Sequence, residues 1–294
     1  MSWASKIAKP YRVEHGKKFR LKDFNPADTG KLHSEEHAAE LLAKGVGHMA
    51  DLQDRLYAGN RCGLLLIFQA MDAAGKDGAI KHVMSGVNPE GCQVHSFKVP
   101  SAEELNHDFL WRNAKVLPER GQIGIFNRSY YEEVLVVRVH PELLANEKIP
   151  ETLLSKNIWE DRFQDICAWE RYLSRNGFVI RKFFLNVSKK EQKKRFLDRL
   201  DQPEKNWKFS TADLHERERW DDYMKAYEEM VANTSTPEAP WFVIPADNKW
   251  FTRIVVAAVI VDTLENLNLS YPRVDPQKKK ELEAAKKVLL QKHS

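Results

Sequence analysis

The feature that most restricts the fold is a run of apolar residues, 64–68, followed at once by a turn of small residues and then by a helical pattern. A continuous apolar run of this length is typical of a strand buried on both faces of a parallel sheet. We expect further strands at residues 93–97, 123–126, 178–185 and 241–244. Strands that alternate with helices predict an α/β fold, a doubly wound parallel sheet with right-handed crossovers.

Helical spacing of apolar residues marks the segments around these strands. The pattern predicts helices at residues 34–58, 157–176, 188–201 and 213–232. A shorter apolar run, 254–261, is far below the roughly 20 residues that cross a bilayer, and it is typical of a core helix. In a sheet of this type, ligands bind at the carboxyl ends of the strands.

By composition, the chain divides into three parts. Residues 1–30 are polar and interrupted by proline and glycine, which predicts an extended arm laid on the main domain. Residues 31–270 make up that domain. Residues 271–294 are rich in lysine with apolar residues at helical spacing, and they predict a helical tail. This helix either packs on the body or on a partner subunit, or is merely solvated.

The composition also excludes several classes of protein. The 294 residues are 43% hydrophobic and 30% charged, which is typical of a globular chain. Three scattered cysteines without a C-x-x-C pair indicate neither a disulfide framework nor a zinc site, so any metal would be held by oxygen. We find no secretory signal and no membrane span, and we expect a cytoplasmic protein.

The turn after the first buried strand has the composition of a phosphate-binding loop. Small residues let backbone N–H groups approach phosphate oxygens, and the helix that follows adds favourable partial charge. Lys76 can then reach the terminal phosphate. Against the pattern G-x-x-x-x-G-K-[ST], Ala70 replaces the first glycine and Asp77 replaces the hydroxyl residue that holds magnesium. The alternative is a tight strand-to-helix turn with an exposed lysine.

The missing hydroxyl leaves Mg²⁺ in need of another oxygen ligand, because phosphoryl transfer requires a cation to shield the developing charge. Asp72 belongs to the loop and could serve. The same carboxylate could instead be a base that accepts a proton from an attacking phosphate oxygen. The sequence leaves both roles open.

A second polar cluster follows the strand at 123–126. It begins with Asn127 and Arg128, which we expect beside the phosphate-binding loop because parallel strands end at one edge of a sheet. A guanidinium fits phosphate in a bidentate manner. The alternative is that Arg128 forms an ion pair with Glu132 or Glu133.

The stretch 188–213 is strongly basic, with eight lysine and arginine residues between positions 189 and 208. In mononucleotide kinases, a helix and loop of this kind form a lid that closes over the transferred phosphate and excludes water. Arg195 and Arg199 lie one turn apart on one helix face and are the strongest candidates for phosphate contacts. For each lysine alone, a solvated surface is the simpler interpretation.

Together these stretches resemble the type-2 polyphosphate kinases. The resemblance rests on residues 71–78, 126–140, 206–210 and 220–223, and it extends from about residue 31 to residue 267. It implies a P-loop kinase fold of the thymidylate-kinase type with a helical lid. It also implies Mg²⁺-dependent, reversible transfer of phosphoryl groups between inorganic polyphosphate and a nucleotide. The Asn-Arg-Ser-Tyr-Tyr sequence is similar to the class III branch that accepts AMP as well as ADP.

The resemblance further implies roles for single residues. Asp72, Lys76 and Arg128 would be catalytic, and Asp72 and Asp213 would hold Mg²⁺. The lid residues that grip polyphosphate would be Arg195, Arg199, Lys205 and Lys208. Nucleotide and phosphate would be bound by Ala73, Ala74, Gly75, Lys76, Asp77, Gly78, Asn127, Tyr131, Glu132 and Glu133. We also expect a homo-oligomer, a dimer or a tetramer.

Two other functions fit parts of the pattern. One is a nucleoside monophosphate kinase that uses ATP as donor, although the many basic residues of the lid suit a long polyanion better. The other is a non-catalytic protein that binds a polyanion or nucleic acid, which would have no reason to place Asp72 against the bound anion. We therefore expect neither a nucleic-acid partner nor a membrane partner.

Overall fold

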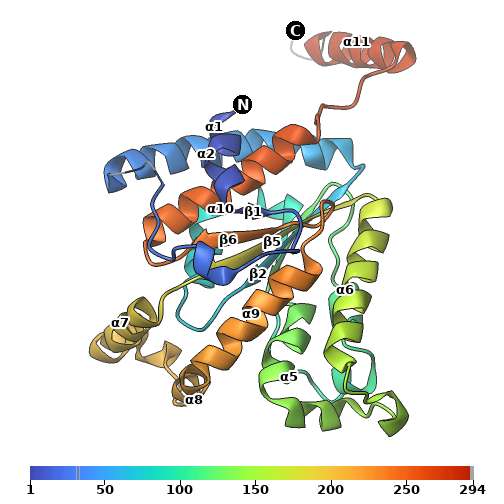
Figure 1. Ribbon diagram of the computed structural model, residues 1–294. Coiled ribbons are helices and arrows are strands. Elements are labelled where there is room, and N and C mark those ends of the chain that lie inside the picture. The colour runs from blue at the N-terminus through green and yellow to red at the C-terminus, as the bar shows by residue number, and fades with distance from the viewer. Residues whose placement is uncertain (31, 33, 292–294) are drawn as a thin grey trace.

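The computed structural model describes residues 1–30, 32 and 34–291, and its centre is a six-stranded sheet in the order β1-β6-β5-β2-β4-β3 (Figure 1). All neighbouring strands are parallel except β1, which is antiparallel to β6. The parallel strands are β2 (Gly63–Gln69), β3 (Cys92–Ser96), β4 (Ile123–Asn127), β5 (Phe178–Asn186) and β6 (Trp241–Pro245). The predicted α/β fold with its parallel sheet is confirmed.

Helices cover both faces of the sheet (Figure 1). α2 (Glu35–Gly59) and α10 (Lys249–Asn266) pack against each other on one face, and α6 (Ile158–Arg175) and α9 (Trp220–Thr234) lie together on the other. The run 254–261 is buried throughout, because α10 is enclosed by the sheet, by α2 and by the N-terminal helix. The remaining short helices are α3 (Lys76–Val83), α4 (Trp111–Ala114), α5 (Val136–Val139), α7 (Lys189–Asp201) and α8 (Ala212–Glu218).

The first thirty residues are not simply extended, which corrects our expectation. Residues Trp3–Ala8 form helix α1, which packs on α10, and Arg12–Val13 form strand β1 at the edge of the sheet. Ser2 caps this helix by accepting a hydrogen bond from the backbone N–H of Ser5. A helix of six residues is too short to show a periodic pattern, so the sequence carried little signal for it.

A second difference concerns the helix predicted at 213–232. The structure has two helices there, α8 and α9, with a break at Arg219. The break turns the chain so that Trp220 and Tyr223 are buried, while α8 stays on the surface beside the lid.

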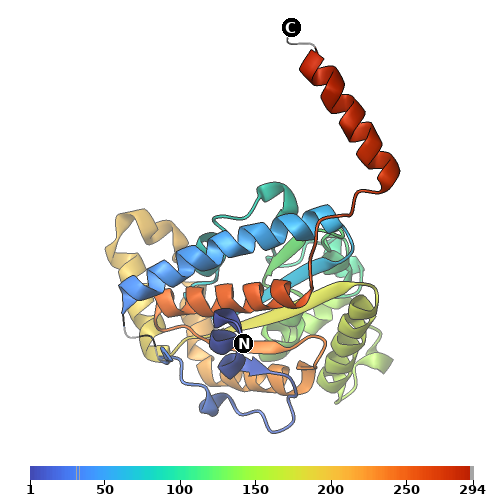
Figure 2. The ribbon, with the colours of Figure 1, turned by 90° about the horizontal axis from the view of Figure 1, so that it is seen from above.

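The predicted C-terminal helix is present as α11 (Pro276–Gln291), and it projects away from the body (Figures 1 and 2). Within the described residues, no helix combines the length and the apolar character that a membrane crossing requires.

Candidate active site

The phosphate-binding loop connects the end of β2 with the start of α3. Ala73 and Gly75 adopt left-handed backbone angles, with φ of 61° and 105°, and these angles turn the chain sharply between strand and helix. A glycine takes such an angle without a steric penalty, whereas Ala73 is held there by its surroundings. The Nζ atom of Lys76 is buried and donates a hydrogen bond to the Ala70 carbonyl oxygen at 2.8 Å. Burial, and then the charge of Arg128, lower the pKa of Lys76.

Arg128 lies next to this loop, as expected from the strand order. Its Nη2 atom is 2.9 Å from Asp72 Oδ1, and its Nη1 atom is 3.4 Å from Glu132 Oε2. The backbone of Arg128 is also left-handed, with φ of 65°, and its N–H donates to the Phe68 carbonyl oxygen at the end of β2. Strained backbone of this kind costs about 1–3 kcal/mol and is frequent at functional sites. Arg128 is therefore held in place by two carboxylates, and the ion pair with Glu132 is part of the site.

Asn127 connects the end of β4 to the phosphate-binding loop. Its Nδ2 atom donates to Asp77 Oδ1 at 2.8 Å, and the hydroxyl of Ser96 lies 3.5 Å away. Asp77 stands where many phosphate-binding loops carry a hydroxyl residue. In this chain its carboxylate instead accepts a hydrogen bond from Asn127 and so fixes the loop against the sheet.

Asp72 and Asp213 are the carboxylates we expected to hold Mg²⁺. Burial, and then the negative charge of Asp72, raise the pKa of Asp213. Asp213 is also 3.5 Å from Arg199 Nη1. In the described part of the chain no group of three or more acidic, histidine or cysteine side chains forms a metal cage. Two carboxylates suit Mg²⁺, which keeps several water ligands and takes others from substrate phosphates.

Arg195, which we expected in the lid, is held by contacts within the protein. It is buried, and its Nη1 atom donates to the carbonyl oxygens of Ala73 and Ala74, at 3.1 and 2.7 Å. Nη2 donates to the carbonyl oxygens of residues 246–247, and Nε lies 2.9 Å from Glu191. All three guanidinium nitrogens are thus engaged by the protein itself. Arg195 therefore supports the phosphate-binding loop, and its contact with polyphosphate stays a prediction.

A cavity of about 420 Å³ lies between the phosphate-binding loop, α7 and α10. All four lid residues we expected border it: Arg195 and Arg199 on α7, and Lys205 and Lys208 on the short helix Pro203–Lys208. Arg199 Nη1 also donates to the Lys208 carbonyl oxygen at 3.3 Å, which links the two parts of the lid. The basic side chains at its wall are Lys81, Arg195, Arg199, Lys205, Lys208, Lys249 and Arg253.

A second cavity, of about 230 Å³, is bordered by Arg128 and by the segment that follows it. Glu132 and Glu133 border it together with Arg128. Phe109 and Arg112 line the same cavity, and the sequence carried no signal for either. They come from a segment without helical or strand periodicity, so no pattern marked them. An aromatic ring, an arginine and carboxylates around one cavity form a set that can bind a nucleotide.

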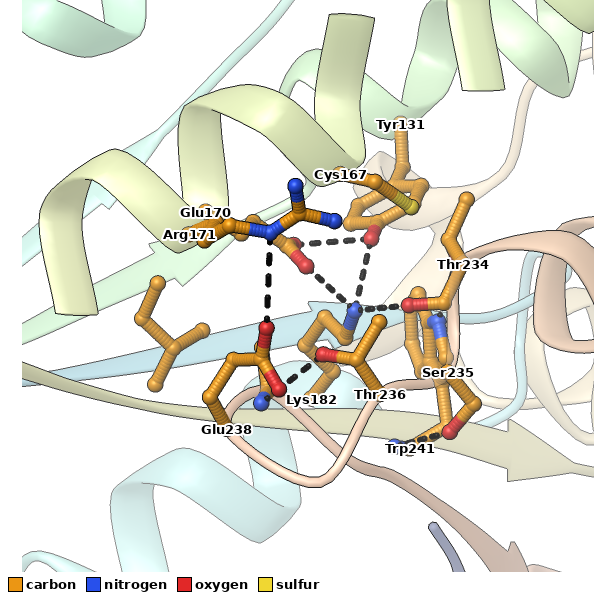
Figure 3. Close-up of polar contacts among 12 residues, drawn as sticks. Tyr131, Cys167, Glu170, Arg171, Lys182, Thr234, Ser235, Thr236, Glu238 and Trp241 are labelled. Atoms are coloured by element: carbon orange, nitrogen blue, oxygen red, sulfur yellow. Dashed lines mark hydrogen bonds and ion pairs between the residues drawn. The ribbon is translucent and has the colours of Figure 1, made fainter. Parts of the chain in front are cut away.

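Tyr131 does not reach either cavity, which corrects our expectation that it contacts a nucleotide. Its side chain is fully buried and its hydroxyl donates to Glu170 Oε1 at 2.8 Å (Figure 3). Lys182 Nζ donates to the same hydroxyl at 2.9 Å and lies 2.6 Å from Glu170 Oε2. Tyr130 donates to Glu170 as well, at 2.9 Å. The two tyrosines therefore anchor the segment that follows Arg128 to α6 and β5.

Glu133 borders the second cavity but is also part of an ion pair, with Arg162 Nε at 3.0 Å. Its pKa is raised to about 8, first by burial and then by the charge of Glu147, while Arg162 opposes the shift. A carboxyl with a raised pKa binds more protons in the folded state than in the unfolded state. Its contribution to stability is complete below its usual pKa of 4.5 and is lost as the pH rises through about 8.

We therefore expect the urea midpoint of unfolding to fall between about pH 5 and pH 8, and the variant Glu133→Gln to show a flatter profile. The glutamine is neutral at every pH, so it removes this proton uptake. Urea titrations of both proteins at three pH values across that window test the expectation. Parallel profiles for the two proteins would contradict it.

Comparison with known proteins gives one consistent result. The family model described as Polyphosphate kinase 2 (PPK2) matches residues 31–272. An ADP-polyphosphate phosphotransferase of Rhodopseudomonas palustris is 54% identical over 283 residues, which cover 96% of this chain and 98% of the relative. An AMP/ADP-polyphosphate phosphotransferase of Meiothermus ruber is 44% identical over 92% of this chain and 98% of its own. A crystal structure of Polyphosphate Kinase 2 from Arthrobacter aurescens TC1 is similar with a TM-score of 0.86, 41% identity, and coverage of 97% and 99%.

Proposed function

Because the chain belongs to the polyphosphate kinase 2 family, we propose that it transfers phosphoryl groups reversibly from inorganic polyphosphate to AMP or ADP, with Mg²⁺. The observation that carries this proposal is the position of the Asp72–Arg128 ion pair. It joins the phosphate-binding loop, which borders the basic cavity, to the strand end that borders the second cavity. A donor and an acceptor on the two sides would meet there. The unpaired, scattered cysteines fit a reducing compartment, and we propose a cytoplasmic enzyme.

The basic cavity suits the donor. Seven of its lining side chains are basic and two, Asp77 and Asp198, are acidic, so it attracts a polyanion. A terminal phosphate of the polymer would lie at the backbone N–H groups of the loop and the N-terminus of α3. Lys76 and Arg128 would then neutralise the charge that develops on the transferred group.

The second cavity suits the nucleotide acceptor. A phosphate oxygen of the nucleotide attacks the terminal phosphorus of the polymer. The bond between that phosphorus and the bridging oxygen breaks, and the shortened polymer leaves. A nucleotide phosphate has a second pKa near 6 and is already largely deprotonated at neutral pH, so the step needs no base. This favours Asp72 as a Mg²⁺ ligand, together with Asp213. The ion, when bound, shields the negative oxygens of the two substrates from each other.

The proposal is tested by incubating the protein with polyphosphate and either AMP or ADP, with Mg²⁺ or with a chelator, and separating the products by chromatography. We expect AMP to be converted to ADP, and ADP to ATP, only when both polyphosphate and Mg²⁺ are present. When ATP is added in place of polyphosphate, we expect no phosphorylation of AMP. Phosphorylation of AMP by ATP alone, without use of polyphosphate, would identify a nucleoside monophosphate kinase instead.

Arg199→Ala is expected to raise the KM for polyphosphate about tenfold, with little change in the KM for the nucleotide. The guanidinium of Arg199 borders the basic cavity, while the nucleotide is assigned to the second cavity. The effect should shrink at high salt, because exposed charges are screened. Lys194→Ala is the matched control, since Lys194 lies on the same helix, is exposed and does not border the cavity. A change confined to the nucleotide KM would contradict the assignment of the lid.

Asn127→Asp is expected to change the ratio of kcat/KM for AMP to kcat/KM for ADP. A carboxylate there adds negative charge near the reacting phosphates, and a diphosphate is repelled more than a monophosphate. The substitution also places two carboxylates together, because the Asn127 amide donates to Asp77. The double variant Asn127→Asp with Asp77→Asn restores that hydrogen bond and keeps the total charge of the pair. If neither variant changes the ratio, acceptor choice lies elsewhere, with Glu132 as the next candidate.

A further inference from the structure

Helix α11 lacks the contacts that normally stabilise a helix of its length. All of its side chains from residue 276 to residue 290 are exposed, and the segment 269–275 that joins it to α10 has no regular structure. It stands clear of the body in two perpendicular views (Figures 1 and 2). An isolated helix of 16 residues is only marginally stable in water. It also lies beyond residue 272, where the match to the family model ends.

One face of α11 combines apolar and basic side chains. Leu282 and Leu289 are seven residues apart and share this face, with exposed fractions of 52% and 68%. Lys279 and Lys286 flank them at spacings of three and four residues. Two copies of this face would repel each other through their lysines. Its partner should therefore be apolar and acidic.

The body carries such a surface on α6. A groove of about 670 Å³, here called the α6 groove, lies between α6 and the segments that contain residues 107–110 and 147–153. Its apolar side chains include Leu153 and Tyr172, which are 62% and 58% exposed. Asp161 and Asp165, one turn apart on α6, are exposed at its edge.

The charge of the α6 groove is not neutralised from within. Arg162, the arginine of the groove, is engaged by Glu133 and Glu147, at 3.0 and 3.2 Å. Asp161 and Asp165 are thus left to attract cations from outside. The indole Nε1 atom of Trp169, also in the groove, is buried and has no hydrogen-bond partner among the described residues. A segment that lies in the groove could supply both the cations and an acceptor for this N–H.

We propose that α11 of one copy lies in the α6 groove of a second copy. Leu282 and Leu289 then cover the apolar floor, while Lys279 and Lys286 meet Asp161 and Asp165. A second copy is favoured over the same chain because α11 leaves from α10, on one face of the sheet, whereas α6 lies on the other (Figure 1). Two copies that exchange their tails about a two-fold axis form this contact twice, as isologous dimers do.

The test measures the mass of the full-length protein by sedimentation or light scattering over a range of micromolar concentrations. Wild type should be a dimer or a higher even oligomer. Lys279→Glu with Lys286→Glu should weaken the association about tenfold or more, because like charges then face each other across the contact. The matched control is Lys280→Glu with Lys287→Glu, which changes the charge of the opposite face of α11 equally and should leave the mass unchanged.

Charge exchange separates this proposal from its alternatives. The groove variant Asp161→Lys with Asp165→Lys should dissociate the protein as the tail variant does, and the combination of both variants should restore the oligomer. A monomeric wild type would overturn the proposal, whether α11 is then solvated or lies on its own body. An oligomer that tolerates both variants would overturn it too, because its interface would lie elsewhere.

Discussion

Replacing Lys76 by methionine is expected to lower kcat by about a hundredfold or more, because a preorganised charge aimed at the transferred phosphoryl group is lost. Methionine keeps most of the apolar stem, which is buried at the start of α3, and removes only the ammonium group and its hydrogen bond to the Ala70 carbonyl oxygen. The loss should appear in kcat more than in either KM, because the charge acts mainly on the transition state.

The measurement is steady-state kinetics with polyphosphate and the better nucleotide acceptor, for wild type and for the variant. Lys193→Met is the control, because this lysine is exposed on α7 and borders neither cavity. Circular dichroism and a thermal melt establish that both variants are folded. Near-normal turnover of Lys76→Met in a folded protein would remove the phosphate-binding loop from the mechanism and, with it, the arrangement of donor and acceptor.

The parts of this structure that could be predicted are those whose signals are local. A buried strand, a turn of small residues and a helix follow one another within residues 63–83, so the sequence alone places Lys76 at the start of a helix. The helix predicted at 188–201 is also present as α7, and the structure shows that Ser188 caps it by accepting a hydrogen bond from the N–H of Glu191. Parallel strand order then brings Arg128 beside the phosphate-binding loop, whereas its contact with Asp72 is known only from the structure.

What could not be predicted is the direction in which a helical face points. The spacing of Arg195 and Arg199 shows that they share a face of α7, but only tertiary packing decides that Arg195 is buried against the phosphate-binding loop while Arg199 stays partly exposed. The same holds for Tyr131, which follows Arg128 closely in sequence but points into the core. Phe109 and Arg112 were missed for another reason, because their segment has no periodicity to interpret.

The buried network around Lys182 leads to the second large expected effect. Lys182 Nζ donates to Glu170, to the Tyr131 hydroxyl and to the Thr234 carbonyl oxygen, at 2.6, 2.9 and 2.8 Å, so its three N–H groups are all satisfied (Figure 3). The side chains of Lys182 and Glu170 are 0% and 1% exposed. Removing one partner of such a pair leaves an uncompensated charge in the core, which costs about 3–5 kcal/mol.

Lys182→Met is therefore expected to lower the free energy of unfolding by about 3–5 kcal/mol, measured by urea titration, and the double variant with Glu170→Gln should recover part of that loss. Glutamine is neutral, so the double variant leaves no buried charge, and its amide oxygen can still accept from the tyrosine hydroxyls.

The network also fixes Tyr130 and Tyr131, which directly follow Arg128 and Ser129 in the chain. Lys182→Met should then lose kcat even at temperatures where it is fully folded, while Tyr172→Phe on the exposed side of α6 should not. Equal stability of the single and double variants would show that the charge of Glu170 is not what makes the loss of Lys182 costly.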